Sequence, residues 1–334
     1  MDPIFVLLTV LFLLAFYLGM GIWIGIGLYA VAITSLAIFR NMPVDKLVAQ
    51  LTYNTVTTPE MVALPMFILM AEVLYHTRLS SSLFNGLAPW TYHLPGRMMH
   101  VNVLGCTLFA AISGSSAATA ATVGRITLAE LFRRGYNRNL VIGSLAGAGT
   151  LGFLIPPSII LIIYGVLSET SILKLFMAGI VPGLILSLCF MGYLGFRATL
   201  NPTLMPEAED PPLWRDRLTS LAELGPVVFL IAMVLGSMYA GIASPSEAAA
   251  VGVLGAFLVS AGQKTLNLKT LRMACLGAVR TTSMIALIVA GAVFLSVSMA
   301  YLGVPRMIAN EIAALQLAPI SLIMLLLLFY AVLG

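Results

Sequence analysis

The sequence predicts an all-α protein that crosses a membrane many times. Of its 334 residues, 60% are hydrophobic and 9% are charged, and the mean hydropathy is +1.04. A soluble domain carries about 25% charged residues, so this composition excludes an ordinary water-soluble fold. The apolar segments are continuous, whereas the strands of a membrane barrel alternate polar and apolar residues. The spanning elements are therefore expected to be helices.

Ten apolar stretches mark the expected membrane segments. They cover residues 4–17, 22–39, 61–74, 101–112, 141–167, 175–196, 226–239, 248–260, 283–302 and 319–333. The first 36 apolar residues, 4–39, are too long for one span of about 20 residues. The glycines of Gly19-Met-Gly21 are expected to hold the turn between two spans.

Two segments, residues 101–112 and 117–131, are each too short to span the bilayer comfortably. Basic residues flank both outer ends, which predicts a re-entrant helical hairpin over residues 97–138. Its tip consists of Ser113, Gly114, Ser115 and Ser116. Irregular backbone survives in a membrane only where protein or a water-filled cavity surrounds it, so the tip predicts a polar binding site. A close helix contact through small residues is the alternative.

Residues 141–167 hold a second interruption. Pro156 and Pro157 remove two backbone donors and obstruct the preceding turn. Ser158 follows at a position suited to capping a restarted helix. This pattern predicts a discontinuous helix that lines a cavity, with a simple proline kink as the alternative.

Two charged residues lie inside apolar sequence. Arg125 is nine residues beyond Ser116, about 13 Å along a helix. An ionisable residue at such depth is a functional candidate, and its forked guanidinium suits a carboxylate. The alternatives are a structural pair with Glu130 or snorkelling toward the inner face. Glu72 also lies within a span, and the sequence assigns it no role beyond pairing near a boundary.

Two short motifs favour helix capping over chemistry. Ser244-Pro-Ser-Glu247 places Ser at the N-cap, Pro at N1 and Glu at N3 of the following helix. Thr57-Thr-Pro-Glu60 is expected to start another helix in a similar way. Neither motif is interpreted as catalytic.

The distribution of basic residues predicts the topology. With the N-terminus outside, twelve Lys and Arg fall on the inner side, four fall on the outer side, and Arg125 lies within the membrane. This asymmetry satisfies the positive-inside rule. The pI near 9.0 is therefore a topology signal, and no nucleic-acid partner is expected.

The chain is expected to contain two membrane repeats. Residues 1–196 form the first, residues 197–223 form a cytoplasmic linker rich in proline, and residues 224–334 form the second. Phe109 aligns weakly with Phe329 at an offset of 220 residues. The second repeat starts on the opposite side, as in inverted-repeat transporters. It is expected to stop at its own hairpin tip, Gly334, about 90 residues short of a full repeat.

Several motifs in order resemble the large membrane subunit, DctM-like, of tripartite ATP-independent periplasmic (TRAP) transporters. They are Ala63-Leu-Pro-Met-Phe-Ile-Leu, Ile112-Ser-Gly-Ser-Ser-Ala-Ala-Thr, Arg134-Gly-Tyr136, Gly152-Phe-Leu-Ile-Pro-Pro-Ser-Ile, Ala178-Gly-Ile-Val-Pro-Gly183 and Ser244-Pro-Ser-Glu-Ala-Ala-Ala-Val-Gly252. The second hairpin and second break usual in this family are absent. The resemblance implies an elevator-type transporter in the bacterial inner membrane, driven by Na⁺ and taking up an organic acid such as a C4-dicarboxylate.

The resemblance also implies partners and site residues. A DctP-like periplasmic binding protein would deliver the substrate, and a small four-helix DctQ-like subunit would sit beside this chain in the lipid bilayer. The residues expected to bind Na⁺ are Ser113, Gly114, Ser115, Gly149 and Thr150. The residues expected to bind substrate are Ser115, Ser116, Arg125, Pro157 and Ser158.

Two other functions are weighed. A stand-alone Na⁺/anion symporter from a related inverted-repeat family would need no binding protein. An intramembrane enzyme would need a nucleophile and a base, but Ser115 has no histidine within the spans and no HExxH motif exists. No catalytic residue and no cofactor other than Na⁺ as coupling ion are expected. Sialic acid and other sugar or keto acids compete with C4-dicarboxylates as substrates.

Overall fold

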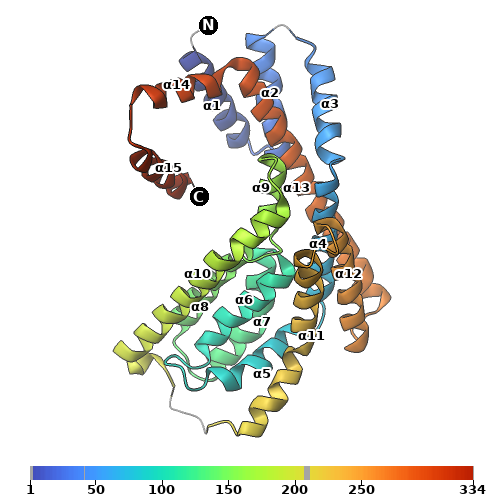
Figure 1. Cartoon of the computed structure of the whole chain (residues 1–334), viewed down its shortest axis with the longest axis vertical. Coiled ribbons are helices and arrows are strands. Elements are labelled where there is room, and N and C mark those ends of the chain that lie inside the picture. Colours follow the sequence, from blue (N-terminus) through green and yellow to red (C-terminus); the bar gives the residue numbers. More distant parts are fainter. Residues whose placement is uncertain (1–2, 41, 207–210, 334) are drawn as a thin grey trace. The chain divides into compact units, whose positions relative to one another are not determined.

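The computed structural model describes residues 3–40, 42–206 and 211–333. These residues form helices and connecting loops, with no strand among them (Figure 1). By length and composition, four helices can cross a membrane: α10 (Ile172–Leu200), α11 (Trp214–Tyr239), α12 (Pro245–Gly262) and α13 (Leu268–Leu302). A fifth span is possible if α3 (Val44–Val56) and α4 (Pro59–Tyr75) count together. The predicted all-α, multi-pass membrane fold is confirmed.

The chain divides into two compact units. Unit 1 contains residues 1–56 and 284–334, and unit 2 contains residues 57–283. Helix α13 contributes its first half to unit 2 and its second half to unit 1. The division into two repeats around residue 210 stays a prediction. Within the expected linker, helix α10 ends at Leu200, a short 3-10 helix η2 (Pro202–Leu204) follows, and residues 207–210 lie outside the described residues.

Unit 1 has a small apolar core. The elements of this unit are α1 (Pro3–Gly19), α2 (Ile24–Phe39), α3, the end of α13, α14 (Val304–Ala314) and α15 (Pro319–Leu333). The other helices form the core, and α15 contributes no described residue to it. Gly21 has a positive φ of 77° between α1 and α2, which confirms the predicted turn. Tyr29 stacks on Phe294 with 5.6 Å between ring centroids. The expected second tip, Gly334, lies outside the described residues.

Unit 2 holds the larger core. Besides α4, α10, α11, α12 and the start of α13, its elements are α5 (Leu79–Thr91), α6 (Met99–Ser113), α7 (Ser116–Arg133), α8 (Arg138–Gly149), η1 (Thr150–Phe153) and α9 (Ile159–Leu167). Figure 1 shows α6, α7 and α8 side by side, and each contacts the other two. Helix α6 is buried along most of its length, so protein rather than lipid surrounds it.

Two side-chain hydrogen bonds fix α6 to its neighbours. The Asn102 amide nitrogen donates to the Ser144 hydroxyl of α8 at 2.9 Å. The hydroxyls of Thr107 and Ser187, on α6 and α10, are 2.8 Å apart. Buried polar groups need such partners, and these pairs specify the position of α6 among otherwise apolar contacts.

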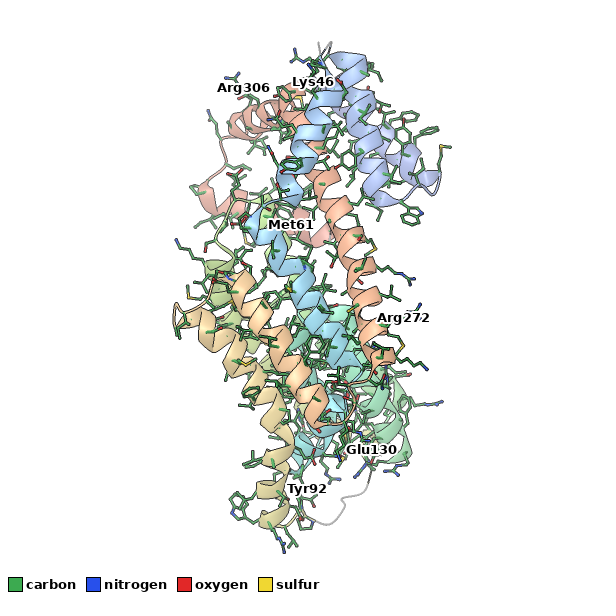
Figure 2. The ribbon with its side chains drawn as sticks, turned by 90° about the vertical axis from the view of Figure 1, so that its right-hand side faces the viewer. Lys46, Met61, Tyr92, Glu130, Arg272 and Arg306 are labelled. Atoms are coloured by element: carbon green, nitrogen blue, oxygen red, sulfur yellow. The ribbon has the colours of Figure 1, made fainter. Side chains whose placement is uncertain are left out.

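Capping and charge pairing define the helix ends of unit 2. Ser244 and Glu247 form the predicted capping box of α12, with the Ser244 N–H donating to the Glu247 carboxylate at 2.7 Å. Thr58 and Pro59 occupy the N-cap and N1 positions of α4, which confirms the predicted helix start, but the Thr58 side chain makes no capping hydrogen bond. Figure 2 places Met61, at the start of α4, and Glu130, near the end of α7, toward opposite ends of this unit.

Candidate functional site

The hairpin tip is a tight reversal between α6 and α7. Helix α6 ends at Ser113, and Gly114 takes the left-handed conformation with a φ of 60°. Ser115 is the N-cap of α7, and its hydroxyl accepts the Ala118 N–H at 3.3 Å. Glycine is suited to the positive φ, and serine is suited to the cap. The predicted tip is therefore confirmed in position.

A second hydroxyl pair lies just inside the tip. The Ser113 and Thr119 hydroxyls are 2.8 Å apart, and both residues are fully buried. This contact joins the last turn of α6 to the first turn of α7. The tip thus provides partners for the Ser113 and Ser115 hydroxyls from its own residues.

The second interruption lies between α8 and α9. Helix α8 ends at Gly149, η1 follows, and residues 154–158 are not helical. Ser158 caps α9: its hydroxyl donates to the Phe153 carbonyl at 2.7 Å and receives the Leu161 N–H at 3.5 Å. The predicted discontinuous helix is confirmed, and the simple kink is excluded because several residues separate the two helical parts.

The two interruptions meet. The Ile159 N–H at the start of α9 donates to the Gly114 carbonyl at 2.9 Å. A Cβ added to Gly114 would collide with the Pro157 carbonyl oxygen, and one added to Gly152 would come 2.7 Å from the Ser116 nitrogen. Both approaches therefore require glycine. Hereafter the region where the hairpin tip (Gly114 and Ser116) contacts the second interruption (Gly152 and Pro157) is called the crossing.

The other residues predicted for the site lie around the crossing. Gly149 packs against Ala120 of α7, and a Cβ added to Gly149 would come 2.9 Å from the Ala120 Cβ. Thr150 lies on the outside of the fold, and its hydroxyl donates to the Gly147 carbonyl at 2.7 Å. Pro157 and Ser158 are buried in the break itself. The structure thus brings the serine tip and the proline break together, with Thr150 at the rim.

A cavity of about 350 Å³ lies beside the tip. Its lining comes from α4, α7, α9 and α13: Ile68, Ala71, Glu72, Tyr75, Ser115, Ala117, Ala118, Ala121, Ile159 and Thr281. Among these described lining residues, Glu72 alone is acidic. The cavity shares Ser115 and Ile159 with the crossing, so it opens directly beside the crossing.

Arg125 lies one helical turn beyond Ala121 on α7. Its guanidinium carbon is 4.4 Å from the centre of the Tyr75 ring, a cation–π contact. Glu130 does not pair with it: the Glu130 carboxylate binds Arg133 at 2.6 Å and Arg134 at 2.7 Å. The alternative pairing of Arg125 with Glu130 is therefore wrong in this structure. Arg125 instead contacts Tyr75, which lines the cavity.

The sequence alone does not reveal the whole cavity. It does not single out Tyr75 or Thr281, and it gives Glu72 no role in a site. Tyr75 follows Glu72 by three residues, which places both on one face of α4 and is a readable signal. Nothing in the sequence connects Thr281 to either residue, because it lies about 200 positions further along the chain.

Comparison with known families and proteins gives consistent matches. The family described as "Tripartite ATP-independent periplasmic transporter, DctM component" matches residues 8–334. A C4-dicarboxylate TRAP transporter large permease protein of Rhodobacter capsulatus is 33% identical over 306 residues, covering 86% of this chain and 68% of that protein. A permease of the same description from Pseudomonas aeruginosa is 35% identical over 262 residues, covering 78% and 60%.

A third relative carries a different substrate name. An ectoine/5-hydroxyectoine TRAP transporter large permease protein of Ruegeria pomeroyi is 30% identical over 295 residues, covering 86% of this chain and 67% of that protein. The chain thus spans 60 to 68% of the length of these three relatives.

Proposed function

Because this chain belongs to the DctM component family of tripartite ATP-independent periplasmic transporters, we propose that it takes up an organic acid by Na⁺ symport. The family consists of transporter permeases, so the chain is a multi-pass membrane transporter component and not an enzyme. Its proposed location is the inner membrane of a bacterium, with the N-terminus in the periplasm.

The crossing is the observation that carries this proposal. Discontinuous helices in secondary transporters direct half-helix N-termini toward anionic groups, while unwound carbonyls coordinate the coupling ion. Here the N-termini of α7 and α9 both begin at the crossing, with capping serines at Ser115 and Ser158. Each N-terminus carries a partial positive charge that favours an anion.

The proposed ligand sets follow from this arrangement. Hydroxyl and carbonyl oxygens of Ser113, Gly114, Ser115, Gly149 and Thr150 are the proposed Na⁺ site. The substrate carboxylate is proposed to lie at Ser115, Ser116, Pro157 and Ser158, with Arg125 as its charged partner. Arg125 supports this role because its guanidinium, stacked on Tyr75, binds no carboxylate among the described residues.

The proposed partners are a small four-helix membrane subunit and a soluble periplasmic binding protein that delivers the substrate. C4-dicarboxylates and ectoines, named in the relatives, are both proposed classes of substrate. A stand-alone Na⁺/anion symporter would need neither partner.

Uptake by the complete assembly in proteoliposomes tests the proposal. Radiolabelled succinate and ectoine are offered with and without an inward Na⁺ gradient, and with and without the binding protein. The proposal expects uptake of one substrate that requires both. Uptake that needs Na⁺ but not the binding protein would support the stand-alone symporter, and uptake that ignores Na⁺ would reject symport.

A further inference from the structure

The Glu72 carboxylate lines the cavity without a protein partner. It makes no hydrogen bond or ion pair with another described residue, although every neighbour in the lining is uncharged. A charged group among apolar neighbours is costly unless an opposite charge compensates it. The cavity therefore favours a ligand that carries positive charge.

Gly277 of α13 makes room for this carboxylate. A Cβ added to Gly277 would come 2.7 Å from the Glu72 carboxylate carbon and 2.7 and 3.0 Å from its two oxygens. The carboxylate thus packs directly on the α13 backbone, and a larger residue at position 277 would displace it. Glu72 is held in place by packing, which suits a group that binds a ligand.

Arg125 does not neutralise Glu72. Both residues flank Tyr75, but the Arg125 guanidinium stacks on the Tyr75 ring and forms no ion pair with Glu72. The negative group therefore lines the cavity, whereas Arg125 lies outside the lining and contacts its Tyr75 wall. A ligand with both charges can place its cation at Glu72 and its carboxylate at the N-terminus of α7, where Ser115 lines the same cavity.

The lining favours an organic cation over a bare metal ion. Six of the ten lining residues are Ala or Ile, and the oxygens come from Glu72, Tyr75, Ser115 and Thr281. A hard cation prefers a compact shell of six or more oxygens. A cavity of about 350 Å³ walled by methyl groups suits instead a small organic molecule. A dianion such as succinate would be repelled by Glu72.

We propose that this cavity selects a zwitterionic substrate, whose cationic nitrogen binds Glu72 while its carboxylate binds the Ser115 end of α7. The inference rests on the proposed function and names its substrate class. Tyr75 supplies an aromatic wall to the cationic group, and the alanines of α7 contact its apolar part.

Calorimetric binding to the purified membrane complex, without binding protein and with NaCl present, tests the inference. Ectoine is the zwitterionic probe and succinate is the dianionic probe. Wild type is expected to bind ectoine at least about tenfold more tightly than succinate. Glu72→Gln is expected to weaken the binding of ectoine by about tenfold, because one charge-assisted contact is lost. The binding of succinate is expected to be unchanged or tighter.

Two further variants separate charge from folding. Gly277→Ala keeps the Glu72 carboxylate but displaces it. It is therefore expected to weaken the binding of ectoine several-fold and to leave the binding of succinate unchanged. Glu223→Gln makes the same change on an exposed face of α11 and is expected to alter neither affinity. Melting temperatures of all variants are measured in parallel.

The outcomes separate failure of the zwitterion proposal from failure of the proposed transport function. If wild type binds succinate more tightly than ectoine, and does so in a Na⁺-dependent way, the proposed function is kept and the proposal of a zwitterionic substrate is overturned. An equal loss of both probes in Glu72→Gln would assign Glu72 to proton or Na⁺ coupling, which also overturns it. Binding of neither probe would overturn the zwitterion proposal and both substrate classes named for the proposed function, while uptake of another organic acid would still keep Na⁺ symport.

Discussion

At the hairpin tip the Ser113 and Ser115 hydroxyls are bonded to protein groups, whereas in the cavity next to it the Glu72 carboxylate is bonded to no described residue. The hydroxyls of Ser113, Ser115 and Ser158 all bond to protein groups. The Glu72 carboxylate and the Arg125 guanidinium have no ionic partner among the described residues. The tip is thus held by its own hydrogen bonds, and the cavity keeps the Glu72 charge for a ligand. Helix α7 belongs to both regions.

The largest expected effect is at the left-handed glycine of the tip. Gly114→Ala places a side chain at positive φ, which costs about 1 kcal/mol or more, and drives it into the Pro157 carbonyl. We expect at least about 2 kcal/mol of lost stability and loss of most uptake, measured by thermal melting and proteoliposome transport.

A helical glycine in open space is the matched control. Gly143→Ala on α8 meets nothing within 4 Å and should be neutral or stabilise by up to about 1 kcal/mol. If Gly114→Ala melts and transports like Gly143→Ala, the crossing is not the rigid element described above.

The second effect concerns the other side of the crossing. Gly152→Ala puts a methyl group 2.7 Å from the Ser116 nitrogen, at a position without positive φ. Overpacking of this kind costs about 1–3 kcal/mol. Gly192→Ala on α10, which has open space around it, is the control in the same melting experiment. Equal melting temperatures would show that the tip and η1 can move apart freely.

The third effect compares two serine caps. Ser115 caps α7 at the tip, and Ser244 caps α12 in an exposed capping box. Each Ser→Ala change is expected to cost about 1 kcal/mol of stability. The expected result is similar destabilisation of both, measured by chemical or thermal unfolding in detergent. A far larger loss at Ser115 would mean that its hydroxyl supports more of the tip than one cap.

The smallest effect is expected far from both regions, at Glu130. Partial burial raises the pKa of this carboxyl, but hydrogen bonds from Arg133 and Arg134 outweigh it and leave the pKa lowered. The stabilisation is therefore full above the ordinary value of 4.5 and is lost as pH falls through the lower folded-state pKa. Glu130→Gln is expected to cost about 0.5 kcal/mol or less at pH 7, with the difference vanishing in acid.

Melting curves of wild type and Glu130→Gln between pH 3 and pH 7, taken about one unit apart, check this expectation. A gap between the two proteins that widens in acid would contradict the sign.

The tip and the break were predictable because their causes are local. A left-handed glycine, a capping serine and a Pro-Pro pair act on their own stretch of chain, so Gly114, Ser115 and Pro157 could be placed from sequence. The Gly19–Gly21 turn and the Ser244 capping box are readable for the same reason.

The cavity was not predictable in the same way. Its charge comes from α4, its Ser115 comes from α7, and the glycine behind Glu72 comes from α13, so only packing brings Glu72, Ser115 and Gly277 near one another. The sequence leaves Glu130 open as a partner of Arg125, five residues away on the same helix. Arg133 and Arg134 lie closer to Glu130 along the helix, at spacings of three and four, and bind it instead.

The central claim is that the polar tip binds the coupling ion in addition to shaping the fold. Substrate uptake against Na⁺ concentration, in proteoliposomes holding Ser115→Ala or Ser244→Ala assemblies, tests it most directly, since both variants lose a comparable cap. Ser115→Ala is expected to raise the Na⁺ concentration for half-maximal uptake by about tenfold, and Ser244→Ala is expected to leave it unchanged. Identical Na⁺ curves for the two variants would contradict the claim.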